Sequence, residues 1–251
     1  MNEELPVGEP VDVEPARPPQ RRALEGRYIR VRPLAPNADA EPARPPERRP
    51  LDGRYVRVRP LDPPADAELL WSASHDGSTP ADRLWTYMYE PFADRAAMRD
   101  WLDGCAASSD PLFMTIESHE TGPVGMAAFM NIVPEHRRLE IGHIWYAPSA
   151  QRTEANTEAA YLMMREAFDE LGYRRVEWKC DALNARSRAA ALRLGFTFEG
   201  VFRAHMIVRG RNRDSAWFSL LDTEWRAARL ALERWLDADP EGRPPLASLR
   251  G

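Results

Sequence analysis

The stretch "WYAPSAQRTEANTEAAYLMM", Trp145–Met164, changes character halfway along and decides how the chain folds. An apolar run ends at Pro148, a polar string without glycine follows, and a helical pattern begins near Glu154. Such a string is either a plain connection between a strand and a helix, or a turn that presents the N–H groups of a helix N-terminus to an anion. The segments on either side of the string distinguish a plain connection from an anion-binding turn.

A strand precedes this string, and a helix and another strand follow it. The segment "RRLEIGHIWYA" (137–147) has apolar residues on both faces, as a central strand of a covered sheet does. A helix is predicted from about Glu154 to Leu171, because apolar residues form one stripe and Gly172 is placed to end it. The segment "YRRVEWKCDA" (173–182) again indicates a strand. A strand–helix–strand unit therefore lies at the centre of the chain.

The flanking segments continue this mixed pattern of helices and strands. The further predicted elements are, in chain order, two or three short helices within 62–105, an antiparallel strand pair at 111–118 and 124–133, a short helix after the N-cap candidate Asn184, two strands around "RGRNR" (209–213), and an amphipathic helix over about 223–236. We therefore expect an α+β fold in which strands and helices are mixed.

The N-terminal region contains a tandem repeat. Residues 16–41 and 43–68 agree at 20 of 26 positions with a spacing of 27 residues, and each copy contains one strand pattern. We assign the first strand of the domain to the second copy, over 54–60. Since 14 of the 23 prolines fall within 1–64, residues 1–50 are predicted to be a mobile extension, followed by an acyltransferase domain (51–225) and a C-terminal helix with its tail (226–251). Alternatively, the first copy adds an edge strand or swaps into a second protomer.

Composition excludes several classes of protein. The 251 residues carry a net charge of −5, so the basic surface of a nucleic-acid-binding protein is not expected. The two cysteines have no metal-ligand or redox spacing, and neither a signal peptide nor an apolar run long enough to span a membrane is present. We expect a cytoplasmic protein without a metal and without nucleic-acid or membrane partners.

An ordered set of motifs is similar to that of a known family. These motifs are the Gln151-Arg152 loop, the helix with Thr157-Glu158-Ala159, the sequence Asn184-x-x-Ser187, and the segments Leu194-Gly195-Phe196 and Glu199-Gly200. In this order they resemble the GNAT superfamily of acyl-CoA-dependent N-acetyltransferases, in particular the branch with the ribosomal-protein N-terminal acetyltransferases. The resemblance covers about 53–225. It implies a central twisted mixed sheet of six to seven strands, flanked by helices, with a C-terminal helix.

The resemblance implies that acetyl-CoA binds at the end of the central strand and on the following turn. The positions implied to bind it are Trp145, Tyr146, Gln151, Arg152, Thr153, Glu154, Ala155, Asn156, Thr157, Asn184 and Ser187. The physics agrees, because a helix N-terminus binds a pyrophosphate through unpaired N–H groups. Where the widespread pattern has two glycines, this chain has Glu154 and Asn156, so the Glu154 carboxylate has to turn outward to solvent to avoid repelling the phosphates.

Three residues are candidates for catalysis. Glu140, on the central strand, is the preferred general base, since burial raises the pKa of a carboxyl group; the alternative is a structural ion pair with Arg137 or Arg138. His143 is the second candidate base, and strand alternation places it on the face opposite Glu140. The resemblance implies that Ser187 lies near the sulfur as a proton donor, although helix capping also explains the Asn-x-x-Ser motif.

The resemblance implies transfer of an acetyl group from acetyl-CoA to a primary amine by direct attack. The acceptor is either a protein N-terminus or a small-molecule amine, and the enzyme is a monomer or a homodimer. A non-catalytic acyl-CoA-binding or protein-interaction module with the same fold is the alternative.

Overall fold

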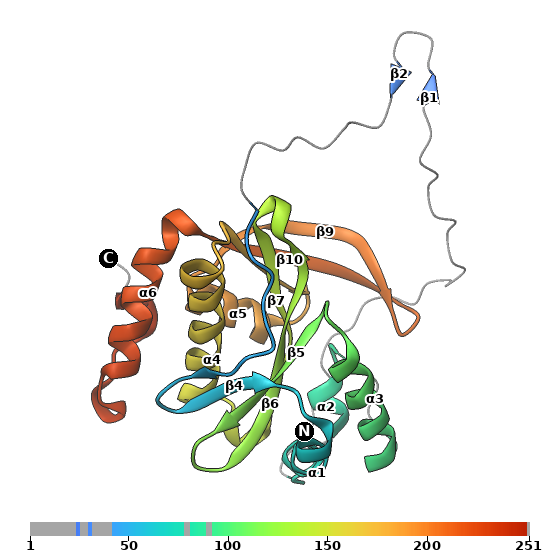
Figure 1. Cartoon of the computed structure of the whole chain (residues 1–251), viewed down its shortest axis with the longest axis vertical. Coiled ribbons are helices and arrows are strands. Elements are labelled where there is room, and N and C mark those ends of the chain that lie inside the picture. The colour runs from blue at the N-terminus through green and yellow to red at the C-terminus, as the bar shows by residue number, and fades with distance from the viewer. Residues whose placement is uncertain (1–23, 26–29, 32–41, 78–80, 89–91, 250–251) are drawn as a thin grey trace.

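A mixed β-sheet forms the centre of the molecule (Figure 1). The computed structural model describes residues 24–25, 30–31, 42–77, 81–88 and 92–249, and their main sheet has eight strands in the order β3-β4-β5-β6-β7-β8-β10-β9. The strands are β3 (Leu51–Asp52), β4 (Val56–Pro60), β5 (Leu112–Ser118), β6 (Gly122–Val133), β7 (Arg138–Tyr146), β8 (Arg175–Asp181), β9 (Thr197–Val208) and β10 (Arg211–Leu221). Neighbouring strands are antiparallel except β7 and β8, which are parallel. The predicted mixed α+β fold is confirmed.

The sheet contains one strand more than the upper limit of the predicted six to seven. The additional strand is β3, which pairs with β4 through Leu51 opposite Val58 and Asp52 opposite Arg57. Two residues are too few to produce an alternating pattern, so only the longer strand of this hairpin could be recognised beforehand.

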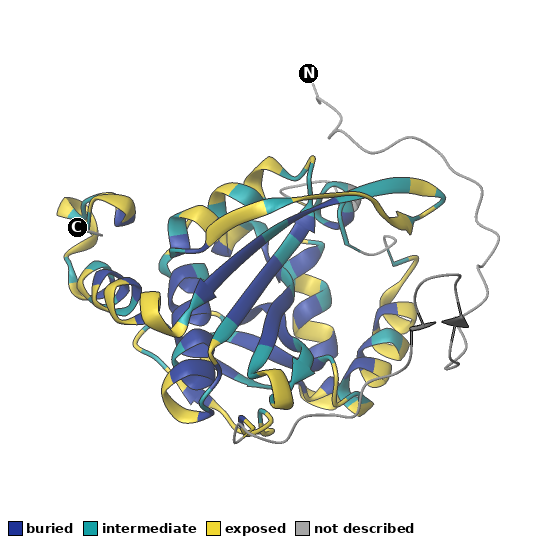
Figure 2. Cartoon of the chain, turned by 90° about the horizontal axis from the view of Figure 1, so that it is seen from above, coloured by how far each residue is buried: buried dark blue, intermediate teal, exposed yellow. Residues whose placement is uncertain are grey.

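Helices cover both faces of the sheet (Figure 1). One face carries α1 (Pro63–Ser74), α2 (Ala81–Trp85) and α3 (Arg95–Ala107), and the other carries α4 (Glu154–Arg165), α5 (Ala185–Leu194) and α6 (Asp222–Asp237). A π-helical turn, Glu166–Glu170, continues α4. Figure 2 shows the buried strands between these layers. In the described part of the chain, no helix has the length and apolar character needed to cross a membrane.

A long hairpin of β9 and β10 forms one edge of the sheet. Its turn contains Arg209 and Gly210 with φ values of 51° and 67°, as a tight two-residue hairpin turn requires. β9 is the edge strand, and most of its residues are exposed (Figure 2).

The two copies of the repeat form the same short hairpin. In the first copy β1 (Leu24–Glu25) pairs with β2 (Arg30–Val31), which is the register of β3 and β4 displaced by the repeat length. Residues 42–50 lie against the domain, since Ala43 is buried and its N–H donates to the Pro134 carbonyl. The predicted mobile extension, 1–50, falls mostly on residues outside the described ranges.

Candidate functional site

The parallel strands β7 and β8 pair at one end and separate at the other. Their register contains three pairs, from Arg138 opposite Arg175 to Glu140 opposite Glu177. Beyond these pairs, among the described strands, β7 pairs with β6 and β8 pairs with β10. We call the separated part, Ile141–Tyr146 of β7 and Trp178–Asp181 of β8, the β7–β8 fork. In sheets with parallel strands, ligands bind beyond the carboxyl ends of the strands, as at this fork.

A β-bulge at His143 distorts β7 within the fork. Ala128 lies opposite Gly142 and Met126 opposite Trp145, so a single residue of β6 faces both His143 and Ile144. His143 has a φ of 50°, in the left-handed region. A bulge removes backbone groups from the hydrogen-bond ladder, which leaves N–H groups available to a ligand.

The bulge also corrects the prediction that Glu140 and His143 lie on opposite faces. The His143 ring is 4.9 Å from the Phe113 ring, on the face covered by α1 and α3. Glu140 is on this face too. Gly142 lies opposite Ala128, which belongs to the buried cluster under α1 and α3, and a Cβ added to Gly142 would lie 3.4 Å from Glu140 Oε1. The extra residue shifts the alternation, so both candidate bases lie on one face.

Glu140 is held by two donors. Its Oε2 lies 2.6 Å from Lys179 Nζ and accepts a hydrogen bond of 2.7 Å from Asn131 Nδ2. The alternative interpretation, a structural ion pair with Arg137 or Arg138, is wrong in its partner: Glu140 does form an ion pair, but the cation is Lys179. Burial raises the pKa of Glu140, and Lys179 and Asn131 oppose this rise. Burial also lowers the pKa of His143, and Arg213 lowers it further.

The turn after β7 ends in a capped helix. Gln151 Nε2 donates to the Tyr146 carbonyl at 3.2 Å, and Thr153 Oγ1 accepts from the Ala155 N–H at 3.3 Å at the start of α4. Arg152 has a φ of 65° in this turn. The N-terminus of α4 is therefore fixed at the end of β7, where its unpaired N–H groups can receive an anion.

The Glu154 carboxylate is neutralised by an arginine from the C-terminal segment. Glu154 Oε1 is 2.7 Å from Arg243 Nη1, and the Arg243 guanidinium stacks 4.2 Å from the centroid of the Trp235 ring. The sequence predicted that the Glu154 carboxylate turns outward to solvent. Instead it turns to Arg243. A second cation, Arg193, donates to the buried Thr157 Oγ1 at 2.9 Å, beside the first turn of α4. Neither arginine was a predicted site residue.

Asn184 and Ser187 lie on the other face of the sheet. Asn184 Oδ1 accepts from the Ser187 N–H at 3.1 Å and caps α5. Ser187 Oγ accepts from Trp178 Nε1 at 3.0 Å, and Trp178 belongs to the core on the α4 side. The predicted catalytic residues therefore form two groups, Ser187 on one side of the fork and Glu140 with His143 on the other.

Aromatic side chains close the fork on the side of α1–α3. The rings of Trp145 and Trp85 meet edge to face at 5.1 Å, and both are buried. Tyr146 lies in the core on the α4 side instead, and burial raises its pKa.

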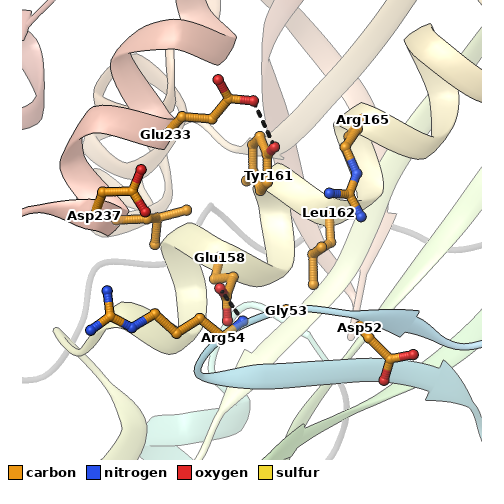
Figure 3. A pocket seen from close by; sticks show the side chains of 10 residues that line it. Asp52, Gly53, Arg54, Glu158, Tyr161, Leu162, Arg165, Glu233 and Asp237 are labelled. Atoms are coloured by element: carbon orange, nitrogen blue, oxygen red, sulfur yellow. Dashed lines mark hydrogen bonds between the residues drawn. The ribbon is translucent and has the colours of Figure 1, made fainter.

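A separate cavity of about 280 Å³ lies between the β3–β4 turn, α4 and α6 (Figure 3). Glu158 lies in its wall and accepts hydrogen bonds of 2.6–2.7 Å from the N–H groups of Arg54, Tyr55 and Val56. A Cβ on Gly53 would come within 2.5 Å of Glu158 Cδ, so the turn needs glycine here. This carboxylate fixes the repeat hairpin to α4, away from the fork.

Comparison with known proteins identifies the family. Residues 56–197 match the sequence model of the acetyltransferase (GNAT) domain. The match covers more than half of the chain, which therefore belongs to the GNAT acetyltransferase family. The predicted family is confirmed, and acetyl transfer is its general activity.

Several relatives show the extent of the similarity. A GCN5-related N-acetyltransferase from Brucella melitensis is 43% identical, with a TM-score of 0.80 over 84% of this chain and 98% of that chain. A probable GNAT acetyltransferase from Chromobacterium violaceum is 37% identical, with a TM-score of 0.69 over 78% of this chain and all of that chain. YdaF of Bacillus subtilis, provisionally named a ribosomal N-acetyltransferase, is 33% identical over 105 residues, 42% of this chain and 57% of that protein. This last similarity, over little more than half of YdaF, agrees with the predicted branch.

Proposed function

We propose that the protein transfers an acetyl group from acetyl-CoA to a primary amine, either of a protein N-terminus or of a small molecule. The observation that carries this proposal is the bulged β7–β8 fork, with a helix N-terminus on one side and a buried carboxylate and a half-buried imidazole on the other. The similarity to YdaF favours a protein N-terminus, and the similar fold of the immunity acetyltransferase MccE, solved with acetyl-CoA and AMP, is compatible with a small molecule.

The proposed cofactor site runs along β7 into α4. The backbone of 151–157, which begins with Gln151 and Arg152 and continues through Asn156, wraps the pyrophosphate, while Arg243 keeps the Glu154 charge compensated. The backbone at Trp145 and Tyr146 pairs with the pantetheine arm as a neighbouring strand would. Asn184 borders the same arm from α5.

In the proposed reaction the neutral amine attacks the thioester carbonyl. A C–N bond forms and the C–S bond breaks, while backbone N–H groups near Ile144 and Trp145 polarise the carbonyl. Glu140 accepts the amine proton, and His143, which lies on the same face, is the second candidate base. Ser187 donates a proton to the leaving thiolate and regains one from solvent, while Glu140 releases the amine proton to solvent.

Two measurements test this function on the full chain. Acetyl-CoA should raise the melting temperature, and thiol release with a panel of amines should detect turnover. Glu140→Gln should lower kcat about 10²- to 10⁴-fold while the acetyl-CoA shift persists. If Glu140→Gln turns over at the wild-type rate and His143→Asn does not, His143 is the base. A shift without thiol release from any amine would instead support a non-catalytic acyl-CoA-binding module.

A further inference from the structure

A second, smaller cavity lies between the β9–β10 turn and α2. Its volume is about 130 Å³, and the residues that line it include Arg209, Arg211 and Arg213 together with Asp181 and Tyr87. Among the described residues that line the cavity, three are arginines and one is a carboxylate. This carboxylate is already engaged, because Asp181 Oδ1 accepts from the Leu183 N–H at 2.8 Å. The described lining therefore carries more positive than negative charge, which favours an anion.

Arg213, which lines this cavity, has an unsatisfied donor. Its Nε is buried and has no hydrogen-bond partner within the described residues. A buried N–H without a partner costs about 1–3 kcal/mol, so such groups in native proteins call for a bound partner. An oxyanion is the strongest partner for a guanidinium group, since the planar fork of N–H donors matches two carboxylate or phosphate oxygens.

The cavity adjoins the fork on the side of the candidate bases. Asp181 is the last residue of β8 and belongs to both the cavity and the fork. Arg213 lies near enough to His143 to lower the pKa of the imidazole, in addition to the larger effect of burial. A group bound at Arg213 would therefore hold the rest of its molecule beside Glu140 and His143.

We propose that the acceptor is an amine that also carries a carboxylate or phosphate group, and that this arginine-lined cavity binds the anionic group. The proposal rests on the N-acetyltransferase function proposed above. A volume of 130 Å³ equals about four water molecules, which suits one such group and excludes a folded chain. Polyamines and peptides with basic N-terminal segments would be repelled here.

The three arginines are not equally suitable for a substitution that tests the anion site. Arg209 Nη2 donates to the Trp85 carbonyl and so ties the hairpin to α2, which makes it unsuitable. Arg213 is the informative position. Arg203, an exposed residue of β9 on the same hairpin that does not line the cavity, is the matched control.

The experiment measures kcat/KM of the full chain for pairs of acceptors that differ in the anion. O-phosphoethanolamine is compared with ethanolamine, β-alanine with propylamine, and a short peptide with acidic residues after its N-terminus with its amide counterpart. We expect a preference of at least tenfold for the anionic member of a pair. Arg213→Gln should reduce this preference about tenfold, Arg203→Gln should leave it unchanged, and Arg213→Lys should keep part of it. If the preference is larger for the small-molecule pairs, the acceptor is a small molecule; if it is larger for the peptide pair, the acceptor is a peptide.

A binding measurement keeps the two proposals separable. O-phosphoethanolamine should raise the melting temperature of the wild-type protein more than ethanolamine does, and Arg213→Gln should remove the difference. Turnover of neutral and anionic amines at equal kcat/KM would overturn the anion site and leave the acetyltransferase function standing. If no amine turns over, the acetyltransferase function fails, and the binding difference alone decides whether the cavity takes an anion. Equal effects of Arg213→Gln and Arg203→Gln would also overturn the anion site.

Discussion

The two ends of the β7–β8 pair differ in how their polar groups are satisfied. At the paired end each buried carboxylate has a cation: Glu140 has Lys179, the second fork residue of β8, at 2.6 Å, and Glu177 has Arg175 at 2.8 Å, although Glu177 Oε2 has no hydrogen-bond partner among the described residues. At the fork, the buried Trp145 Nε1 and the nearby Arg213 Nε have no hydrogen-bond partner in the described part of the chain. Both ends belong to the same two strands of one sheet, so the difference comes from the loss of pairing beyond Glu140.

This difference shows how a stable sheet can contain a binding site. The paired end holds the strands together with matched charges and ladder bonds. The fork has fewer bonds, so its backbone and side-chain donors remain for ligands. The candidate bases lie at the boundary, where a rigid frame can position them while the bulge exposes them to the fork. Loss of the cation that pairs with Glu140 should therefore lower stability most, and a displaced backbone at the fork should lower activity more than stability.

Removal of Lys179 should have the largest effect on stability. Lys179→Met leaves Glu140 buried without a cation, and breaking a buried pair in this way costs about 3–5 kcal/mol. Urea unfolding at pH 7 measures the loss. The double variant Glu140→Gln/Lys179→Met should recover much of it, and a double variant as unstable as Lys179→Met would show that the carboxylate is not the cause.

The same variant should have a characteristic pH dependence. Lys179 lowers the pKa of Glu140 against the effect of burial, so without Lys179 the pKa in the folded state rises further. A carboxyl group whose pKa is higher in the folded than in the unfolded state contributes stability at low pH and loses it as pH rises through the folded pKa. The stability difference between Lys179→Met and wild type should therefore shrink from pH 7 towards pH 4. A difference that is constant over this range would contradict the ion-pair explanation.

At the fork, Gly125→Ala should reduce activity more than stability. A Cβ on Gly125 would lie 2.2 Å from the Trp145 carbonyl oxygen, so β6 and β7 would have to move apart beside the bulge. We expect about 1–3 kcal/mol of lost stability and a loss of up to about 10²-fold in kcat/KM, because small displacements misplace reacting groups. Gly104→Ala is the control. Gly104 lies on α3, and no atom lies within 4 Å of the position that its Cβ would take. Equal activity of both variants would refute the role of this contact.

Part of this arrangement could be predicted from sequence alone. The helix from Glu154 and the cap at Asn184 follow from local patterns, and the structure places them as predicted. The bulge at His143 was missed because β7 is apolar on both faces. In such a strand, polar and apolar residues do not alternate, so an extra residue leaves no mark in the sequence pattern. Lys179 and Arg243 were missed as partners because their contacts depend on strand register and on the fold of a distant segment, which no local pattern encodes.

A smaller effect is expected where α4 meets the C-terminal segment. Arg243→Met leaves Glu154 uncompensated beside the proposed pyrophosphate site. The negative charge should weaken acetyl-CoA binding about three- to tenfold, as expected for loss of one partly exposed ion pair of about 1 kcal/mol. Calorimetric titration measures the affinity. The double variant Glu154→Gln/Arg243→Met should bind about as tightly as wild type, and weak binding by this double variant would mean that Arg243 acts through packing on Trp235.

Exchange of the repeat copies should have the smallest effect on activity, because the repeat is far from both ends of the β7–β8 pair. Deletion of residues 42–68 joins the first copy directly to Leu69, so that Gly26, Tyr28 and Val31 replace the hairpin residues of the second copy. Leu24 and Val31 already pair in the register of Leu51 and Val58, and the main core change is an added methylene from Ile29 in place of Val56. Overpacking by one methylene costs about 1–3 kcal/mol, so the variant should fold with a somewhat lower melting temperature and unchanged kcat. Deletion of residues 16–42, which keeps the second copy, should change neither. Loss of folding or of the oligomeric state in the second deletion would instead assign the first copy a place of its own in the assembled protein.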